Sequence, residues 1–229
     1  MSIRLPPAPS TAERRSAGEE NSPRHAGAYT AGLVNRRTAS GCLLEVVETL
    51  VLTLIIFFVI QAFVAQPYQI HQPSMESTLE PDQFVLVDKL TPRFDSYKRG
   101  DIVVFTPPTG WEQDNTPFIK RVIGVAGDTV EIRDGHVIIN GAQLSEPYLY
   151  AVDGQPQPTV DAQAHGTWTV PDGELFLMGD HREVSEDSRA FGSVAVGNVI
   201  GRAWLRYWPV AVFGVLQSPT YEGVRPPAP

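Results

Sequence analysis

The chain has 229 residues, of which 42% are hydrophobic, enough for one sizeable core and too apolar for wholesale disorder. Its formal charge of −8 is uneven, because residues 1–42 contain six arginines and three glutamates, whereas residues 66–229 contain twelve Lys/Arg and twenty-one Asp/Glu. An acidic body argues against nucleic acid as a partner. The single cysteine, Cys42, excludes an intramolecular disulfide and a zinc site built on Cys pairs. No H-E-x-x-H spacing occurs, and we expect no metal and no other cofactor.

Residues 1–42 lack apolar periodicity, which predicts a disordered basic tail. Residues 49–65 (TLVLTLIIFFVIQAFVA) carry no charge, and we expect a transmembrane anchor over residues 43–66, since about 20 helical residues cross a hydrocarbon core. A buried core helix is the alternative, but a helix apolar on every face fits lipid better. The run lacks an A-x-A-like end, which favours an uncleaved anchor over a cleaved signal peptide. Arg36 and Arg37 place the N-terminus in the cytoplasm.

Beyond the apolar run the pattern changes to that of β-strands. Short apolar or alternating segments bounded by Gly, Pro and Asp predict strands at residues 84–90, 101–105, 118–125 and 174–178. Asp134 and Gly135 suit the positive φ angles of a type I′ turn, so residues 130–139 are expected to form a hairpin. No long amphipathic helix follows residue 66, and we therefore predict a mainly β fold with an antiparallel domain.

The β domain is expected to extend over residues 67–210. Residues 145–173 are rich in Pro, Gly and polar side chains and are predicted to be a loop-rich insertion. Residues 211–229 are expected to form a C-terminal tail. The apolar stretch 208–216 is too short to span a membrane, so it either rests on the core or touches the bilayer surface through its aromatic side chains.

Ser74 lies in the segment QPSMESTL, with no histidine or aspartate in a familiar nucleophile spacing around it. It is either a turn or helix cap or a nucleophile that needs a base from elsewhere. In strand 118–125, Lys120 and Arg121 point to opposite faces, so one of them must lie among apolar side chains. A buried lysine can respond by losing its proton, whereas an arginine stays charged. A lysine that reaches solvent from a half-exposed strand is the alternative.

A third segment, residues 178–192, follows an apolar strand and concentrates groups that can pair with one another. Its members are Asp180, Arg182, Ser185, Asp187, Ser188 and Arg189. Such hydroxyls are suited to orient an amine, and such ion pairs are suited to hold a loop still. The segment is therefore a candidate support for a catalytic group.

Taken in order, these segments resemble the motif boxes of type I signal peptidases. The matching residues are Ser74-Met75 with Thr78-Leu79, Gly100 to Phe105, Lys120 to Gly124 with Gly127-Asp128, Gly179-Asp180 with Arg182, Ser185, Asp187-Ser188-Arg189 and Gly192, and finally Gly201-Arg202-Ala203. The resemblance covers the anchor and roughly residues 66–209. It implies an antiparallel β-sheet or half-barrel catalytic domain behind a single N-terminal transmembrane helix.

The resemblance also implies roles for individual residues. Ser74 would be the nucleophile and Lys120 the general base, with Ser185 positioning that lysine and with Asp187 and Arg189 bracing the loop. Positions that line shallow substrate pockets in the family are occupied by Ile70, Met75, Leu79, Phe118 and Ile119. The chemistry is consistent, because a neutral amine can accept the serine proton without a histidine. Apolar burial can lower a lysine pKa from about 10.4 to about 7.5.

Gln72 departs from the family pattern, in which a serine two positions before the nucleophile contributes a side-chain donor to the oxyanion hole. Here the amide of Gln72 would act beside the backbone N–H of Ser74. The family commonly has Pro where Ser77 stands, and Asn where His181 and Val184 stand. These differences concern the oxyanion hole and the hydrogen bonds of the loop, and they leave the Ser/Lys pair intact.

The resulting hypothesis is a membrane-bound serine endopeptidase that removes signal peptides from exported preproteins after small residues, at A-x-A-like sites, through an acyl-enzyme. The expected partners are signal peptides, membrane lipid and the protein export machinery. The expected location is the bacterial plasma membrane, with the N-terminus in the cytoplasm and the catalytic domain outside it. Two alternatives remain, a self-cleaving Ser/Lys autoprotease and a catalytically silent anchored β module that binds partners.

Overall fold

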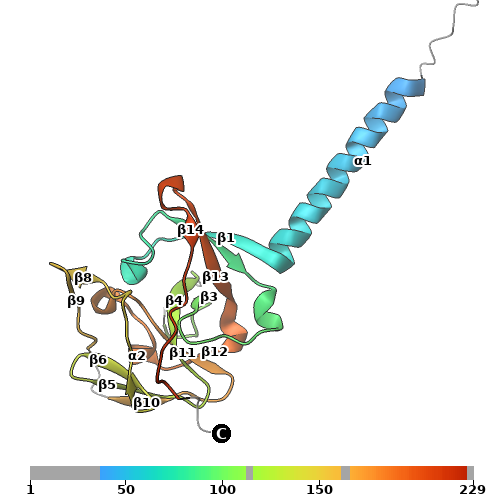
Figure 1. The fold of residues 1–229 in the computed structure, drawn as a ribbon. Helices are drawn as coiled ribbons and strands as arrows, with labels where there is room; N and C mark the ends of the chain where they lie inside the picture. The colour runs from blue at the N-terminus through green and yellow to red at the C-terminus, as the bar shows by residue number, and fades with distance from the viewer. Residues whose placement is uncertain (1–36, 112–115, 161–165, 226–229) are drawn as a thin grey trace, which may run out of the picture. The chain divides into compact units, whose positions relative to one another are not determined.

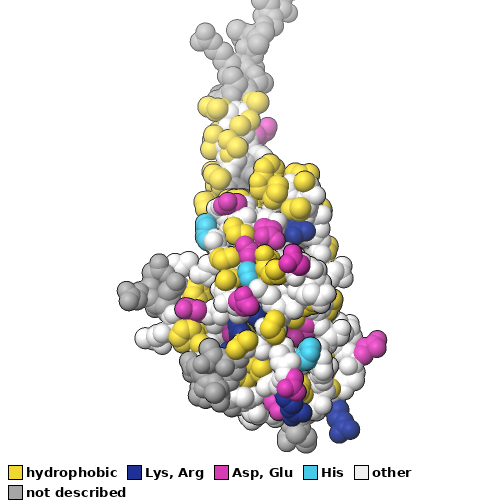
Figure 2. All heavy atoms as spheres, turned by 90° about the vertical axis from the view of Figure 1, so that its left-hand side faces the viewer, with side chains coloured by type: hydrophobic (Ala, Val, Ile, Leu, Met, Phe, Trp, Pro, Cys, Tyr) yellow, Lys and Arg dark blue, Asp and Glu magenta, His cyan; other side chains and the backbone are white. Residues whose placement is uncertain are grey.

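The computed structural model describes residues 37–111, 116–160 and 166–225, and Figure 1 shows its ribbon. The described chain begins with helix α1 (Arg37–Val59), which continues into a π-helical turn, η1 (Ile60–Val64). Within the described residues, Gly41–Val59 is the one helical segment long and apolar enough to cross a membrane. Its large apolar side chains are exposed, and Figure 2 shows them along the helix. The prediction of a single apolar N-terminal helix is therefore confirmed. The basic tail predicted over residues 1–42 lies mostly outside the described residues.

The β domain is built on an antiparallel sheet of eight strands that curls into a half-barrel (Figure 1). The strand order is β1-β2-β13-β3-β4-β11-β12, and β14 pairs with β13. The strands are β1 (Ala65–Gln69), β2 (Phe84–Asp88), β3 (Ile102–Phe105), β4 (Phe118–Val125), β11 (Glu174–Met178), β12 (Val194–Ala195), β13 (Val199–Trp208) and β14 (Gly214–Val215). The predicted mainly β fold with an antiparallel sheet is confirmed.

A second sheet of four strands has the order β10-β5-β6-β7. Its strands are β5 (Thr129–Arg133), β6 (His136–Ile139), β7 (Ala142–Gln143) and β10 (Thr167–Thr169). The β5–β6 hairpin turns at Asp134 and Gly135, whose φ angles are +52° and +80°. Two consecutive positive φ angles are the requirement of a type I′ turn, which an Asp-Gly pair meets at little cost. The predicted hairpin is confirmed.

The remaining elements are short. They are the hairpin of β8 (Ala151–Val152) and β9 (Gln155–Pro156), the helix α2 (Ser188–Phe191), and the 3-10 turns η2 (Pro73–Met75), η3 (Thr91–Arg93), η4 (Arg182–Val184), η5 (Val196–Asn198) and η6 (Val210–Val212). The described residues of the segment predicted to be a loop-rich insertion, 145–160 and 166–173, contain three short strands.

The apolar side chains of β3 explain why this strand lies in the middle of the sheet. Ile102 and Val104 pack into one buried cluster, with Val85 and Val87 of β2, whereas Val103 and Phe105 pack into another. A strand apolar on both faces gains most when both faces are covered. A third cluster joins Ile123 of β4 and residues of β11 to the small sheet. Met75 and Leu79, in the segment that follows β1, belong to the first cluster, and Met178, at the end of β11, belongs to the third.

Residues 211–225 run back along the domain and are tied to it at several points. The backbone N–H of Leu216 donates to the Trp204 carbonyl at 2.8 Å, and the Ser218 hydroxyl donates to Asp101 at 3.0 Å. Tyr221 and Val224 pack against the third apolar cluster. The C-terminal segment is therefore part of the folded domain up to residue 225.

Candidate active site

Ser74 lies in the 3-10 turn η2, directly after strand β1 and its extension at Ile70. The Glu76 and Leu79 N–H groups close the turn by donating to the carbonyls of Pro73 (3.0 Å) and Met75 (2.7 Å). Met75 and Leu79 are fully buried in the first apolar cluster. Their burial anchors the chain directly after Ser74, whose own exposure is 3%. The turn therefore presents a nearly enclosed hydroxyl.

Lys120 lies on β4, between β3 and β11, and is 1% exposed. Its Nζ is hydrogen bonded to Ser74 Oγ at 2.7 Å, although 46 residues separate the two in the chain. The same Nζ lies 5.1 Å from the centre of the Phe118 ring. The prediction that Lys120 is a buried lysine is therefore confirmed. The alternative, a lysine that reaches solvent from a half-exposed strand, is wrong.

Burial lowers the pKa of Lys120 from 10.5 to about 8, because the ammonium loses its hydration. The carboxylate of Asp187 acts in the opposite direction and limits the fall of this pKa, while Arg189 adds to it. An amine with a pKa near 8 is partly neutral at physiological pH, and a neutral amine has a lone pair that can accept the Ser74 proton. The pair can therefore generate a serine nucleophile without a histidine.

The loop Gly179–Arg189, called here the 179–189 loop, leaves β11 and passes beside Ser74. A Cβ built on Gly179 would overlap the Ser185 hydroxyl and the Ser74 carbonyl oxygen. The next contact is the His181 N–H, which donates to the same Ser74 carbonyl at 3.1 Å. Glycine is needed at residue 179 because only a residue without a side chain allows this approach. The position of the loop thus sets the position of the Ser74 backbone.

Ser185 lies in this site, but its contact differs from the predicted one. Its hydroxyl donates to Asp187 Oδ2 at 2.7 Å, and no hydrogen bond joins it to Lys120 within the described part of the chain. A carboxylate is the stronger acceptor and competes successfully for the single hydroxyl proton. Asp187 also accepts from the Gly179 N–H at 3.1 Å and forms an ion pair with Arg189 at 2.8 Å. These bonds, set against the cost of burial, hold the pKa of Asp187 below its usual value.

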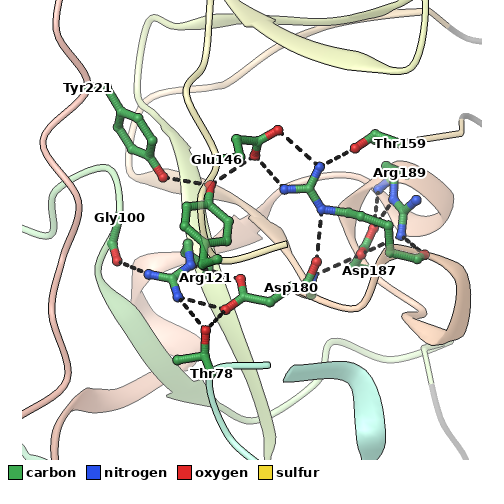
Figure 3. A network of polar contacts seen from close by, with 12 residues as sticks. Thr78, Gly100, Arg121, Glu146, Thr159, Asp180, Asp187, Arg189 and Tyr221 are labelled. Atoms are coloured by element: carbon green, nitrogen blue, oxygen red, sulfur yellow. Dashed lines mark hydrogen bonds and ion pairs between the residues drawn. The ribbon is translucent and has the colours of Figure 1, made fainter. Parts of the chain in front are cut away.

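Arg121, the neighbour of Lys120 on the opposite face of β4, is also 1% exposed. Its Nη2 and Nε bind the two carboxylate oxygens of Asp180 at 2.6 and 2.8 Å, and Thr78 Oγ1 donates to Asp180 at 2.5 Å (Figure 3). Arg121 also binds the Gly100 carbonyl at 2.9 Å. The sequence predicts that one of Lys120 and Arg121 lies among apolar neighbours. In the structure both are buried, because the Asp180 carboxylate compensates the charge of Arg121.

Glu76 and His181 form a contact across the site that sequence reasoning missed. The Glu76 carboxylate lies 2.7 Å from His181 Nδ1, and the imidazole stacks on the Tyr150 ring with centroids 3.8 Å apart. Glu76 follows Ser74 by two residues, whereas His181 belongs to the 179–189 loop. The only sequence signal was the unusual histidine at residue 181, and nothing in the chain indicated its partner.

A cavity of about 60 Å³ is lined in part by residues that directly precede the Ser74 turn. Of the residues predicted to bind substrate, Ile70, Phe118 and Ile119 line it, together with Gln72. Met75 and Leu79 are instead fully buried beneath this region, in the apolar cluster that contains Ile70 and Ile119. The Gln72 side chain makes no hydrogen bond to any other described residue, so its amide is available to a ligand. Among the described residues, no group of three or more His, Cys, Asp or Glu side chains is placed to hold a metal ion.

Comparisons with known proteins identify the family. A sequence profile of the family described as "Signal peptidase, peptidase S26" matches residues 43–208. "Signal peptidase I" of Leptolyngbya laminosa is 38% identical over 185 residues, which cover 79% of this chain and 87% of that protein. "Probable signal peptidase I-2" of Synechocystis sp. is 37% identical over 175 residues, or 76% and 77% of the two chains. A crystal structure of a signal peptidase I from Enterococcus faecalis is 36% identical, with a TM-score of 0.39 over 47% of this chain and 97% of that one.

The profile match extends over most of the chain, from the apolar helix to the end of β13. The relatives exceed 30% identity over about three quarters of the sequence. The chain therefore belongs to the signal peptidase family, peptidase S26, and is a signal-peptide-removing serine peptidase.

Proposed function

We propose that this peptidase is a membrane-anchored endopeptidase in which Ser74 is the nucleophile and Lys120 the general base. The observation that carries the proposal is the 2.7 Å contact between Lys120 Nζ and Ser74 Oγ, formed by a lysine whose pKa burial lowers to about 8. A serine hydroxyl is a weak nucleophile until a base accepts its proton. A desolvated lysine at hydrogen-bond distance meets that need.

In the proposed reaction, Ser74 Oγ forms a bond to the carbonyl carbon of the scissile peptide while its proton moves to Lys120 Nζ. Lys120 then donates that proton to the leaving amine, which becomes the N-terminus of the mature protein, and the signal peptide stays esterified to Ser74. A water molecule, deprotonated by Lys120, hydrolyses this ester and restores the hydroxyl. The Ser74 backbone N–H and the Gln72 amide would stabilise the oxyanion of each tetrahedral intermediate.

Specificity for small residues is supported by the dimensions of the cavity that Gln72 lines, two residues before Ser74. Its volume of about 60 Å³ leaves room for a side chain as small as that of alanine. Ile70, Phe118 and Ile119 line it with apolar surface and would exclude charged groups. We therefore expect cleavage after A-x-A-like sequences.

The membrane anchor would be residues 43–66, which include most of the apolar helical stretch Gly41–Val59. Arg36 and Arg37 precede it in the sequence, and by the positive-inside rule they would stay in the cytoplasm. The catalytic domain, residues 67–210, would then lie outside the plasma membrane, where preproteins emerge from the export machinery. The insertion 145–173 and the tail 211–229 would belong to the same external part.

Exposed apolar side chains at the end of β13 support contact of the domain with lipid. Trp208, Val210, Phe213 and Val215 are between 53% and 70% exposed. Hydrophobic side chains also gather at the top of the β domain in Figure 2. Such surfaces on a soluble domain mark an interaction site, and tryptophan favours the membrane–water boundary. Membrane lipid is therefore a proposed partner of this turn as well as of the anchor.

The purified full-length chain in detergent micelles should cleave a preprotein whose signal peptide ends in Ala-x-Ala, after the last alanine. Because Lys120 must be neutral to accept a proton, kcat/KM should rise tenfold per pH unit and level off above a pKa of about 8. Mass spectrometry of the new N-terminus gives the cleavage position, and a pH–rate profile gives the pH dependence of kcat/KM. Absence of cleavage, or cutting of the peptidase alone while the preprotein stays intact, would contradict the proposal.

Replacing Gln72 by alanine should lower kcat by roughly 10²-fold with little change in KM, because one oxyanion donor is typically worth that much. Gln143, an exposed residue of strand β7, is a matched control, and Gln143→Ala should leave both constants unchanged. Steady-state kinetics on the same preprotein distinguish the two. A Gln72→Ala variant with unaltered kcat would show that the Ser74 N–H acts without help from this side chain.

A further inference from the structure

Two buried arginines hold consecutive residues of the 179–189 loop. Arg121 binds the Asp180 carboxylate through two nitrogens, and Arg182 Nε donates to the Gly179 carbonyl at 2.9 Å. Each guanidinium side chain is 1% exposed. A buried arginine keeps its charge and has little freedom to move. The places of Gly179 and Asp180 therefore depend on whatever fixes these two guanidinium groups.

Arg182 is fixed by a carboxylate from another part of the chain. Glu146, in the segment predicted to be an insertion, accepts from Arg182 Nη2 at 2.5 Å and from Nη1 at 3.4 Å. Arg182 Nη1 also donates to the Thr159 hydroxyl. The Glu146 side chain is only 5% exposed, so this ion pair is largely shielded from water. Such pairs are strongly directional when both charges are desolvated.

Tyr148 contacts Arg121 directly and contacts Arg182 through Glu146. Its ring lies against the guanidinium of Arg121, with the Arg121 Cζ 4.0 Å from the ring centre. Its hydroxyl donates to Glu146 Oε1 at 2.9 Å, the same oxygen that binds Arg182. Figure 3 shows Glu146, Arg121 and Asp180 within one network of polar contacts. One side chain thus links the supports of Gly179 and Asp180.

A hydrogen bond between Tyr148 and Tyr221 connects Tyr148 to the C-terminal segment, and its direction can be assigned. Burial raises the pKa of Tyr148 well above its usual value and that of Tyr221 to about 12, so both hydroxyls stay protonated. Tyr148 has one hydroxyl proton, which it gives to Glu146. The 2.7 Å contact between the two hydroxyls must then be donated by Tyr221. Tyr221 therefore orients Tyr148: Tyr221 donates a hydrogen bond to Tyr148, and Tyr148 donates one to Glu146.

We propose that Tyr148 and Glu146, with Tyr221 behind them, are positioning residues that hold the 179–189 loop against Ser74 through Arg121 and Arg182. The inference rests on the proposed roles of Ser74 and Lys120 and extends them. These side chains are not among the residues that line the cavity at Gln72; they act on the loop whose Gly179 and His181 contact the Ser74 carbonyl. The segment 145–160 is accordingly a brace for the catalytic centre.

Loosening this brace should change the environment of Lys120 as well as the speed of the reaction. After burial, the described groups with the largest effect on the Lys120 pKa are Asp187, Arg189, Glu186 and Asp180, and all four belong to the 179–189 loop. A looser loop admits water beside Nζ, and renewed hydration raises a lysine pKa towards its ordinary value. The rising limb of the pH–rate profile should therefore move to higher pH. A residue that only stabilises the fold would leave this limb in place.

The test uses the full-length chain and compares Tyr148→Phe and Glu146→Gln with the wild type on the Ala-x-Ala preprotein. Tyr148→Phe keeps the ring on Arg121 and removes only the hydroxyl bridge. Both variants should lower kcat about tenfold, leave KM within twofold, and shift the limb upward by about half a pH unit or more. Tyr221→Phe, the mildest change, should act in the same direction with a smaller effect. It keeps the test decisive if either first variant fails to fold.

Asn140→Ala is the matched control for lost stability. Asn140 binds Asp128 and the Arg225 carbonyl in a separate network, and its φ of +51° makes alanine unfavourable there. This variant should melt at a lower temperature with an unchanged kcat per folded molecule and an unchanged limb. Unchanged kcat and limb in the Tyr148 and Glu146 variants would overturn the inference. So would a lower kcat without movement of the limb. A wild type that does not cleave would contradict the proposed function instead.

Discussion

Replacing Ser74 by alanine is expected to reduce preprotein cleavage by about 10⁴-fold to 10⁶-fold, the range seen when a serine nucleophile is removed. The loss of activity should appear in kcat, because the substitution removes Oγ, the atom that would form the acyl-enzyme. KM should change little, since the cavity residues Ile70, Phe118 and Ile119 are untouched. Cleavage is followed by gel or mass spectrometry over a time long enough to detect residual turnover.

Ser77, three residues further along, is the matched control for this change. It is exposed, and its φ of +84° is a conformation that glycine adopts more easily. Ser77→Gly should therefore retain activity near that of the wild type. A serine-directed acylating inhibitor should label the wild type and Ser77→Gly but not Ser74→Ala. Continued cleavage by Ser74→Ala would remove this serine from the mechanism and leave the family assignment without its proposed nucleophile.

Replacing Lys120 by methionine should abolish cleavage to a similar extent and, at neutral pH, raise the stability of the fold. Methionine has no proton acceptor for Ser74, so kcat is lost. The stability gain has a separate cause, because the wild type must bury an ammonium whose pKa falls from 10.5 to about 8 on folding. That fall corresponds to about 3 kcal/mol at roughly 1.36 kcal/mol per pKa unit. The lost hydrogen bond to Ser74 offsets about 1 kcal/mol of it.

The sign of this effect determines its pH dependence. Between pH 8 and 10.5 the unfolded state holds the Lys120 proton and the folded state releases it, so wild-type stability rises with pH across this window. Below pH 8 both states hold the proton and the cost is complete. The excess stability of Lys120→Met should thus be greatest below pH 8 and shrink towards pH 10.5. Melting temperatures measured across this range check it, with a difference on the order of several °C at neutral pH.

Lys98→Met provides the control for this second result. Lys98 is 65% exposed and pairs with Asp95 at 3.1 Å, so its replacement should change neither activity nor the pH dependence of stability. A Lys120→Met variant that cleaves normally would refute the assignment of the base. A variant that is inactive but less stable than the wild type below pH 8 would show that Lys120 is not desolvated as described.

The strands that could be predicted from the sequence are those whose pattern is local. Residues 84–88, 102–105, 118–125 and 174–178 are compact apolar or alternating runs, and each forms a strand within two residues of its predicted bounds. Strand β13 was not predicted as a strand, although it has ten residues and pairs with β2, β3 and β14. Its sequence, VIGRAWLRYW, mixes arginine with tryptophan. Its burial depends on distant partners that a local pattern does not reveal.

The residues of the candidate site also fall into two groups, those that the sequence predicts and those that depend on distant partners. Ser74 and Lys120 lie together as the family resemblance implies, and the physical argument for a buried lysine agrees with its 1% exposure. The burial of Arg121 could not be predicted, because its compensating carboxylate, Asp180, lies 59 residues away in the chain. Glu146 and Tyr148 stand in a stretch rich in Pro and Gly, which predicts loops but not contacts. Local patterns report which groups need partners, and only the fold decides which partners they find.

The place of strand β13 in the sheet has a consequence for the order in which a newly made chain can assemble. In the sheet it separates β2, which follows the Ser74 turn, from β3, which precedes the strand that carries Lys120. It is also the last long strand among the described residues, so a chain synthesised from the N-terminus contains Ser74 and Lys120 before the strand that joins their halves of the sheet. The proposed dyad would stay unassembled until residue 208 has been made and paired.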